Sequence, residues 1–439
     1  MAQPRSRYPS TQPQKRPAVT REELRRMKRA KEKEQRRRLQ DAYEAAKGPV
    51  DLPFLLLAML LLAIGLIMLL SASFPTAQAS SKLGNDPLYY FKRQARYGAL
   101  GLAAMYVVSK INYERFRGTE RLAIWGSIFL LALVIIPGPN KYGRLLALGE
   151  NGAARWLGIP GTSMQFQPSE VAKLGVIIFF AEHISQKREK MSILVSKDGA
   201  GPLVLLLLLM SGMVLIEPHM SGAILLFGMG AAMMVAGGIH WKWVALGVTG
   251  VAVAWCLMTY TDVIENILKA VNYNASRIIV WKDPLGGDLE YQRNEAYQIR
   301  QSLITIGSGG LMGVGLGKSH QKYGFLPERH NDYIFAIVFE ELGLVGGTLI
   351  MILFALLIIR GYWLAIHARD RFGSLLVVGV TTQIALQTFL NIAVVTNLIP
   401  STGISLPFFS YGGTALCIQL VELGIVLSVS RQIPAPKAG

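Results

Sequence analysis

The sequence predicts an all-α polytopic membrane protein with about ten transmembrane helices. The 439 residues are 51% hydrophobic and only 17% charged, and their mean hydropathy is +0.36. Apolar runs recur at the length of about 17–25 residues that a helix needs to cross the hydrocarbon core. No segment shows the apolar–polar alternation of a half-buried strand that would compete with a helix. We therefore expect a helical bundle embedded in lipid.

The expected helices follow one another along the whole chain. The fourth opens at Pro168, a residue that suits the first turn of a helix. The sequence NLIPSTGISLPFFSYGG breaks the ninth helix and starts the tenth, and such irregular backbone is tolerated in a membrane where it lines a cavity or is buried in protein. The ten ranges are 52–73, 94–110, 121–137, 168–186, 201–217, 219–238, 241–260, 333–359, 373–399 and 408–430.

Basic residues fix the expected orientation, because cytoplasmic loops carry an excess of Lys and Arg. With ten spans, every basic loop falls on the same side as the basic N-terminus. Both termini are then cytoplasmic, and the loops at 74–93, 138–167, 260–332 and 399–407 are extracytoplasmic. The residues that give this agreement are Lys110, Arg115, Arg117, Arg121, Lys187, Arg188, Lys190, Lys197, His240, Lys242, Arg360, Arg369, Arg371, Arg431 and Lys437.

The N-terminal segment explains much of the formal net charge of +17, since residues 1–50 hold about fifteen Lys and Arg. It has no aromatic-rich or finger-like motif that would stack on or read bases, which argues against nucleic acid as a partner. We expect a disordered or partly helical cytoplasmic tail near anionic lipid headgroups. Residues 51–431 then form the membrane domain, and residues 432–439 a short cytoplasmic tail.

A secretory signal peptide is the alternative for the first apolar run, because Ala77-Gln78-Ala79 resembles a cleavage site. The basic leader is too long for the charged region of a signal peptide, and the apolar run is too long for its core. We therefore expect a transmembrane anchor. Cys256 and Cys417 both lie in expected spans, so no disulfide framework is indicated.

The loop at 260–332, between the seventh and eighth helices, is too long to be only a connector. AYQIRQSLITI within it has the pattern of an amphipathic helix at the membrane interface. The Gly-rich run that follows lacks the Lys-Ser/Thr ending of a phosphate-binding P-loop. We interpret it as a structured re-entrant or lip element.

Three carboxylates mark the start of the eighth span: Asp332, Glu340 and Glu341. A charged group in lipid costs at least about 2–3 kcal/mol, so such acids usually serve a function. At about 100° per residue, Glu340 lies about 80° round the helix from Asp332, and Glu341 about 180°. At most one of the two glutamates can share a cavity with Asp332. Asp332 lies at the rim, and the deeper Glu340 is a candidate for structural hydrogen bonding.

Other polar residues fall at the outer ends of expected spans or, like Arg155, in the second external loop. Arg93 and Arg155 are candidates for substrate binding, with ordinary contact to lipid headgroups as the alternative. Glu170 and Lys173 are three residues apart and share a helix face, so they can also form a purely structural ion pair. Gly412 can line a cavity or allow close helix packing.

Five motifs in order across residues 52–431 resemble the SEDS family of cell-wall polymerases. They resemble its division branch, FtsW and the sporulation relative SpoVE, more closely than RodA. The motifs are KRQ at 92–94, GAARWLGIPG followed by FQPSEVAKL, YQIRQSLITIGSGGLMGVGLG, FLPERHNDYIFAIVFEELG and IPSTGISLPFFSYGG.

The resemblance implies a ten-span peptidoglycan glycosyltransferase that polymerises lipid II outside the plasma membrane. Asp332 matches the essential acidic position of the family. The other matched positions are Arg93, Arg155, Glu170 and Lys173, which surround the same cavity in the family, and Gln301, Ser302, Tyr411 and Gly412, whose roles are less defined. The implied partners are lipid II, undecaprenyl-pyrophosphate-linked glycan, a class B penicillin-binding protein and other division proteins, at the division septum.

The sequence departs from the family pattern at three positions. Asn331 stands where Thr is usual, and Phe339 replaces a small or polar residue before the paired glutamates. His219 stands where Asp is typical, which puts an acidic role for that turn in doubt.

Glycan extension is one inverting displacement, so a single general base suffices, and we expect Asp332 to be that base. Arg93, Arg155 and Lys173 would stabilise the leaving pyrophosphate. The sequence requires no cofactor, and a divalent cation, Mg²⁺ or Mn²⁺, could act beside them. Two alternatives stay open: a flippase or transporter of lipid-linked precursors, and a non-catalytic division scaffold.

Overall fold

The structure is a computed structural model that describes residues 27, 34, 48–136, 147–150, 153–158, 165–187, 191, 193, 199–217, 219–263, 266, 276–284 and 295–433. The chain divides into two units, Met1–Lys47 and Gly48–Gly439. The tails expected at 1–50 and 432–439 fall almost entirely outside the described residues.

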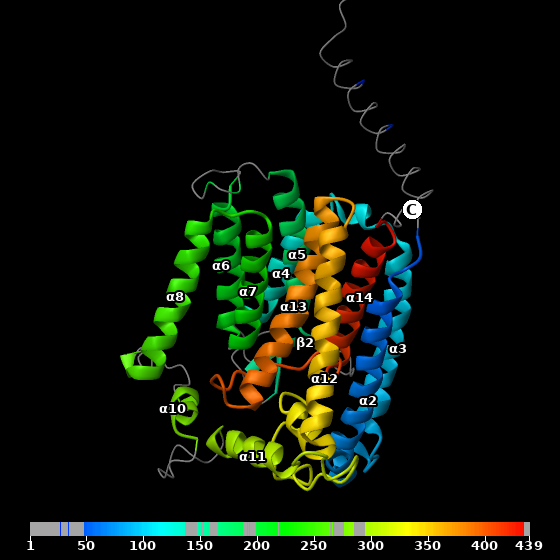
Figure 1. Ribbon diagram of the computed structural model, residues 1–439, viewed down its shortest axis with the longest axis vertical. Coiled ribbons are helices and arrows are strands. Elements are labelled where there is room, and N and C mark those ends of the chain that lie inside the picture. Colours follow the sequence, from blue (N-terminus) through cyan, green and yellow to red (C-terminus); the bar gives the residue numbers. More distant parts are fainter. Residues whose placement is uncertain are drawn as a thin grey trace, which may run out of the picture. The chain divides into compact units, whose positions relative to one another are not determined.

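Within the described residues, each of the ten apolar ranges contains a helix (Figure 1). The helices α10 (Ser276–Lys282) and α11 (Glu295–Ser308) lie in the long loop between the seventh and eighth of them. The ten are α2 (Leu52–Ala79), α3 (Tyr89–Lys110), α4 (Glu120–Ile135), α5 (Pro168–Gln186), α6 (Gly201–Ile216), α7 (Met220–Ala236), α8 (Trp241–Tyr260), α12 (Ile334–His367), α13 (Arg371–Val395) and α14 (Gly413–Ser430).

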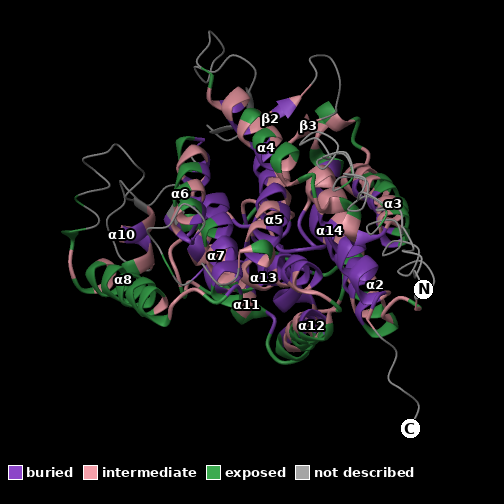
Figure 2. Ribbon diagram, turned by 90° about the horizontal axis from the view of Figure 1, so that it is seen from above, coloured by how far each residue is buried: buried purple, intermediate pink, exposed green. Residues whose placement is uncertain are grey.

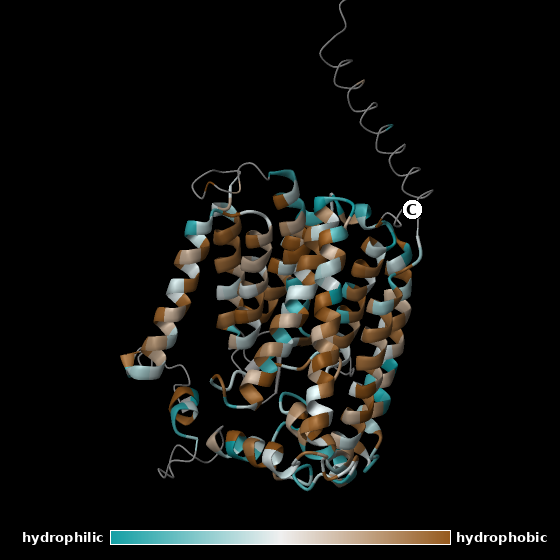
Figure 3. Ribbon diagram, viewed as in Figure 1, coloured by the Kyte–Doolittle hydropathy of each residue, from teal (hydrophilic) through white to brown (hydrophobic). Residues whose placement is uncertain are grey.

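Five helices in the described part of the chain are long and apolar enough to cross a membrane: α2, α8, α12, α13 and α14. The helices α6 and α7 are apolar but shorter. Apolar residues dominate the bundle, and hydrophilic ones gather near its ends (Figure 3). The fold is therefore that of an α-helical multi-pass membrane protein, and the count of ten spans stays a prediction.

The most deeply buried helices are α5, α13 and α14 (Figure 2). The helix α14 packs along α3 at close range, because a Cβ at Gly424 would lie only 2.8 Å from the carbonyl oxygen of Met105. By contrast, α8 has no buried residue. Since α8 is apolar on all sides, its exposed surface is suited to lipid.

A small antiparallel sheet lies in the segment that the sequence analysis treated as a loop. Its strands are β1 (Ala147–Glu150), β2 (Ala153–Gly158) and β3 (Gln165–Phe166), in the order β1-β2-β3. Leu157 of β2 is buried against Val134 of α4, which attaches the sheet to the bundle. The strands are too short to show a clear apolar–polar alternation, so they could not be predicted from the sequence.

The helix α12 is interrupted at Gly343, whose φ of 69° and ψ of −174° are not helical. A turn in the Gly-rich run takes over the hydrogen bonds that this break would leave unmade. Val314 N and Gly315 N donate to the carbonyl oxygens of residues 340 and 341 at 2.9 and 3.0 Å. In return, the amides of residues 344 and 345 donate to the carbonyl oxygens of residues 310 and 311, at 2.9 and 3.1 Å. The Gly-rich run is therefore a structured element, docked on a break in α12.

Glu340 and Glu341 are both buried, and both hold this loop. Glu341 forms an ion pair with Lys322 at 2.9 Å and accepts a hydrogen bond from Ser71 Oγ at 2.7 Å. Glu340 accepts from Ser319 Oγ and, at 3.0 Å, from the amide of residue 320. Because the charge of Glu341 is paired and both carboxylates are hydrogen-bonded, their burial is tolerated.

Replacing Gly343 by Ala should destabilise the protein by about 3 kcal/mol or more, because only glycine adopts this backbone conformation readily. A Cβ at this position would also lie 2.3 Å from Gly313 N. Gly307→Ala is the matched control, since nothing lies within 4 Å of the added Cβ in α11. Thermal unfolding of the purified proteins measures both. Equal melting temperatures for the two variants would show that the break in α12 is dispensable.

Candidate active site

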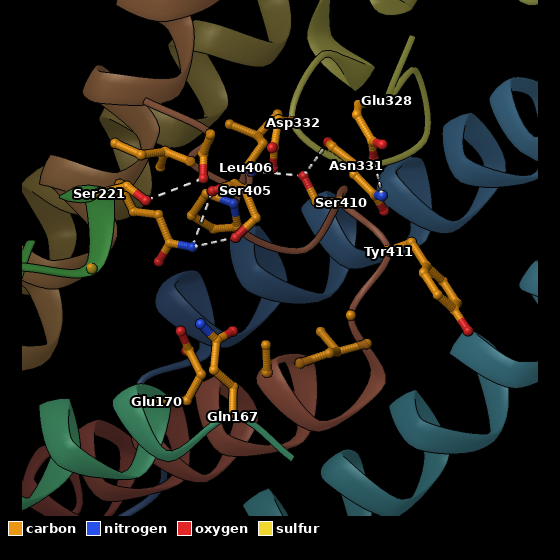
Figure 4. A pocket seen from close by; sticks show the side chains of 18 of the residues that line it. Gln167, Glu170, Ser221, Glu328, Asn331, Asp332, Ser405, Leu406, Ser410 and Tyr411 are labelled. Carbon is orange, nitrogen blue, oxygen red and sulfur yellow. Dashed lines mark hydrogen bonds between the residues drawn. The ribbon is translucent and has the colours of Figure 1, made fainter. Parts of the chain in front are cut away.

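A polar cavity of about 420 Å³ opens at the end of the bundle where α12 and α14 begin. It is lined by side chains from the loops and helix ends that meet there, and Figure 4 shows several of them. Three cationic and three acidic side chains face one space. They are Arg93 of α3, Arg155 of β2, Glu170 of α5, Arg277 of α10, and Glu328 and Asp332 of the loop before α12.

The backbone around Asp332 is held at three successive carbonyl groups. The carbonyl oxygen of His330 accepts from Tyr411 N at 2.9 Å, and that of Asn331 from Ser410 Oγ at 2.7 Å. The carbonyl oxygen of Asp332 accepts from Asn391 Nδ2 at 2.8 Å. The loop is therefore fixed against both α13 and the segment that precedes α14.

The electrostatic surroundings of Asp332 suit a general base. Burial, and to a smaller extent the nearby Glu328, raise the pKa of Asp332 to about 6, while Arg155 and Arg277 act in the opposite direction. A base works best when its pKa lies near the working pH. At neutral pH this carboxylate is mostly ionised and yet more basic than an ordinary Asp.

Two predicted substrate-binding residues reach the same cavity from separate elements. Arg155 projects from β2 and Arg93 from α3, and both line the cavity. Tyr411 lines it as well, and its ring lies 4.9 Å from that of Tyr90 in an edge-to-face contact. Guanidinium groups grouped in this way match the charge and geometry of a phosphate-bearing substrate.

Glu170 and Lys173 form an ion pair at 2.9 Å. Glu170 faces the cavity, whereas Lys173 is only 2% exposed and is not among the residues that line it. Lys173 thus lies behind the cavity wall and contacts it through its ion pair with Glu170. The ion pair predicted for Glu170 is therefore present, and its role in substrate binding stays a prediction.

Gln301 and Ser302 lie on α11 and do not line the cavity. Ser302 Oγ donates to the carbonyl oxygen of Val395 at 2.8 Å, which fastens α11 to the end of α13. Gly412 does line the cavity, and its amide donates to Gln94 Oε1 at 3.2 Å. Glu340 and Glu341 are directed to the Gly-rich run and do not line the cavity.

His219, one of the departures from the family pattern, lies in the cavity wall. Gln167 Nε2 lies 3.1 Å from its Nδ1. Burial, with Arg155 and Lys173 nearby, lowers the pKa of His219 to about 3. The position therefore carries an imidazole whose protonated form is disfavoured, in place of the carboxylate that is typical of the family.

The other two departures from the family pattern, Asn331 and Phe339, both make contacts with neighbouring side chains. Asn331 Nδ2 donates to Glu328 Oε2 at 2.6 Å, within the loop that carries Asp332. The ring of Phe339 packs edge-on against Phe335 at 5.0 Å, inside α12.

Several cavity residues were missed by the sequence analysis, notably Arg277, Glu328 and Gln387. Glu328 lies within the motif FLPERHNDYIFAIVFEELG, four residues before Asp332, but was not singled out as a site residue. Arg277 lies in the long loop and carries no motif. Within the described residues, no group of three or more His, Cys, Asp or Glu side chains is placed to hold a metal ion.

Comparison with known proteins agrees with this fold. Residues 51–434 match the FtsW/RodA/SpoVE family model, whose description is cell cycle protein. The chain belongs to this family. Stage V sporulation protein E of Bacillus subtilis (strain 168) is 37% identical over 386 residues, which covers 88% of this chain and 98% of that protein. The probable peptidoglycan glycosyltransferase FtsW of Geobacter metallireducens is 36% identical, with 87% of this chain and 95% of that protein covered.

Two solved structures with a similar fold are a chain of a peptidoglycan synthase complex and a RodA protein. One is a chain from work on the structural coordination of polymerization and crosslinking by a peptidoglycan synthase complex. It has a TM-score of 0.68 and 25% identity, with 87% of this chain and 98% of that chain covered. The crystal structure of Thermus thermophilus rod shape determining protein RodA has a TM-score of 0.61 and 26% identity, with coverages of 88% and 98%.

Asp332→Asn should change stability in a pH-dependent way. The pKa of Asp332 is raised from 3.8 to about 6 in the folded protein. The folded protein therefore favours the protonated form of Asp332. This contribution to stability is fully present below about pH 4 and is lost as the carboxyl ionises, when the pH rises through about 6. At about pH 7.5 the variant should be more stable than the wild type by about 1–2 kcal/mol, a value reduced for the water-accessible cavity. Thermal unfolding from about pH 4 to pH 8 measures the difference. A difference that stays constant over this range would contradict the raised pKa.

Proposed function

We propose that this family member is a peptidoglycan glycosyltransferase that polymerises lipid II into glycan strands. The observation that carries the proposal is the meeting of Asp332 with Arg93, Arg155 and Arg277 in one polar cavity. One base and several cations are what transfer from a lipid pyrophosphate donor requires. The names of similar proteins, among them a probable peptidoglycan glycosyltransferase, support the same activity.

The reaction joins the 4-hydroxyl oxygen of an acceptor sugar to the anomeric carbon of the donor. The bond from that carbon to the pyrophosphate oxygen breaks, and the configuration inverts. Asp332 takes the proton from the attacking hydroxyl as the new bond forms. A second, nucleophilic carboxylate is not needed, because inversion takes place in a single displacement.

The leaving lipid pyrophosphate gains negative charge as the bond breaks. Arg93, Arg155 and Arg277 line the same cavity as Asp332 and would stabilise that charge. A divalent cation bound to the substrate phosphates would add positive charge for the pyrophosphate.

The orientation of the protein in the membrane is part of the proposal. Ten spans with both termini in the cytoplasm would place the cavity on the extracytoplasmic side, where lipid II polymerisation takes place. The basic residues near the opposite helix ends, such as Arg117, Arg371 and Arg431, support this orientation. We place the protein at the division septum of a bacterial plasma membrane. A class B penicillin-binding protein would cross-link its product, in keeping with the similar chain from a peptidoglycan synthase complex.

Asp332→Asn should abolish glycan extension by the purified full-length protein, with the partner transpeptidase present or absent. For the wild type, the rate should rise with pH through about 6, because only the ionised carboxylate can take the proton. Gel analysis of product from labelled lipid II in proteoliposomes measures both effects. Near wild-type extension by the variant would overturn the assignment of the base. Movement of lipid II across the bilayer without polymer would instead indicate a transporter.

Arg93→Gln should lower kcat/KM for lipid II by about 10–100-fold, as expected for the loss of a charge-assisted hydrogen bond of about 1.5–3 kcal/mol. The matched control is Arg96→Gln, because Arg96 lies on the same helix but is exposed and does not line the cavity. Equal rates for the two variants would assign Arg93 to headgroup contact alone.

A further inference from the structure

Asn391 joins two segments that both line the cavity. It lies near the end of α13 and is fully buried. Its single Nδ2 atom donates to the carbonyl oxygen of Asp332 at 2.8 Å and to the carbonyl oxygen of Ile404 at 2.6 Å. Two carbonyl acceptors leave only one orientation for the amide, because its oxygen would repel both.

We propose that Asn391 is a positioning residue for Asp332, and that it sets the separation between the Asp332 loop (residues 326–333) and the 401–411 segment. This inference rests on the proposed function, in which Asp332 is the base. Asn is suited to the task because it is neutral and its amide nitrogen carries two donors. A hydroxyl has only one donor, and a Lys would bring a charge into the buried site.

The 401–411 segment reaches the carboxylate itself. Gly403 has a φ of 67°, and a Cβ at that position would lie 3.1 Å from Asp332 Oδ2. Gly403 is next to Ile404, which Asn391 holds. The side-chain amide of Asn391 therefore fixes two pieces of backbone. One is that of Asp332 itself, and the other is that of Ile404, next to the glycine that lies against the Asp332 carboxylate.

Loosening this link should affect chemistry more than binding. A shift of about 1 Å in a reacting group can cost about 10²-fold in rate. Of the arginines proposed to bind the pyrophosphate, Arg93 and Arg155 lie on α3 and β2, outside both segments that Asn391 joins. Arg277 of α10 donates to the carbonyl oxygen of Ser401 at 3.4 Å, so it is the arginine that this link reaches. The charged groups that face Asp332 are Glu328 on its own loop, Arg155 on β2 and Arg277 on α10. These charged groups are all retained when Asn391 is replaced. If the Asp332 carboxyl then moves toward water, it loses mainly its burial, which is the largest cause of its raised pKa.

The test uses full-length Asn391→Ser and Asn391→Leu proteins, reconstituted with the partner transpeptidase and labelled lipid II. We expect kcat to fall about 10²-fold while KM for lipid II changes by less than about threefold. The acid limb of the pH–rate profile should also move below the wild-type value of about 6, toward that of an ordinary Asp.

Thr388→Val is the matched control, and it should keep the wild-type kcat and pH profile. Thr388 is buried on the same helix, and its hydroxyl makes no hydrogen bond within the part of the chain that the structure describes. Thermal unfolding and size-exclusion chromatography give the folded fraction of each variant.

The positioning role is overturned if activity falls only in proportion to the folded fraction, with the acid limb at the wild-type pH. It is also overturned if kcat stays within about threefold of the wild type. Either result, with Asp332→Asn inactive, leaves the proposed function intact. Activity in Asp332→Asn itself, or a wild type that makes no glycan, would instead remove the proposed function.

Discussion

The need to satisfy every backbone hydrogen bond away from water governs this structure. An unpaired amide or carbonyl in lipid costs several kcal/mol, so irregular backbone survives there only where protein groups replace the missing partners. The break at Gly343 meets this condition, because the Gly-rich run supplies two donors and two acceptors to α12. The loop that carries Asp332 meets it in a second way, with side-chain and backbone donors on three successive carbonyl oxygens. These hydrogen bonds fix both irregular segments, and the second of them carries Asp332 to the cavity.

Buried charges, like buried backbone groups, have partners in this structure. Glu341 with Lys322, and Glu170 with Lys173, form close ion pairs whose members are largely buried. A buried pair contributes little net stability, but removing one member leaves a costly buried charge. The pairs therefore neutralise the acids that hold the framework. The cationic side chains left facing the cavity are arginines, which stay charged in any surroundings and match phosphate oxygens bidentately.

The sequence was a good guide to the helices and to part of the site. Membrane-length apolar runs are strong signals, and each expected range contains a helix within the described residues. Asp332 could be found because it opens a membrane-length apolar run, and Arg93 and Arg155 because they lie in motifs that resemble the family. The motif resemblance was less selective, since Ser302 belongs to a motif but packs against α13.

What the sequence could not give depends on long-range contacts. Arg277 enters the cavity only because α10 folds back toward it, and no local pattern signals this. The helical projection from Asp332 assumed that the helix already includes this residue, whereas α12 begins at Ile334. Asn391 was overlooked because a single polar residue in a long apolar helix has no evident role in the sequence. Its role depends on its two carbonyl acceptors, which only the structure shows.

The raised pKa of Asp332 follows from this rigidity. A flexible loop would let the carboxyl turn toward water, and its pKa would return toward 3.8. Burial and the neighbouring Glu328 disfavour the ionised form, so the fold must hold the acid where it is less stable. The hydrogen bonds to its backbone do this without touching the carboxylate, which stays available to a substrate hydroxyl. A direct hydrogen bond to the carboxylate would also fix it, but would lower its pKa and weaken it as a base. Holding the backbone instead of the side chain is thus what allows one residue to be both fixed and basic.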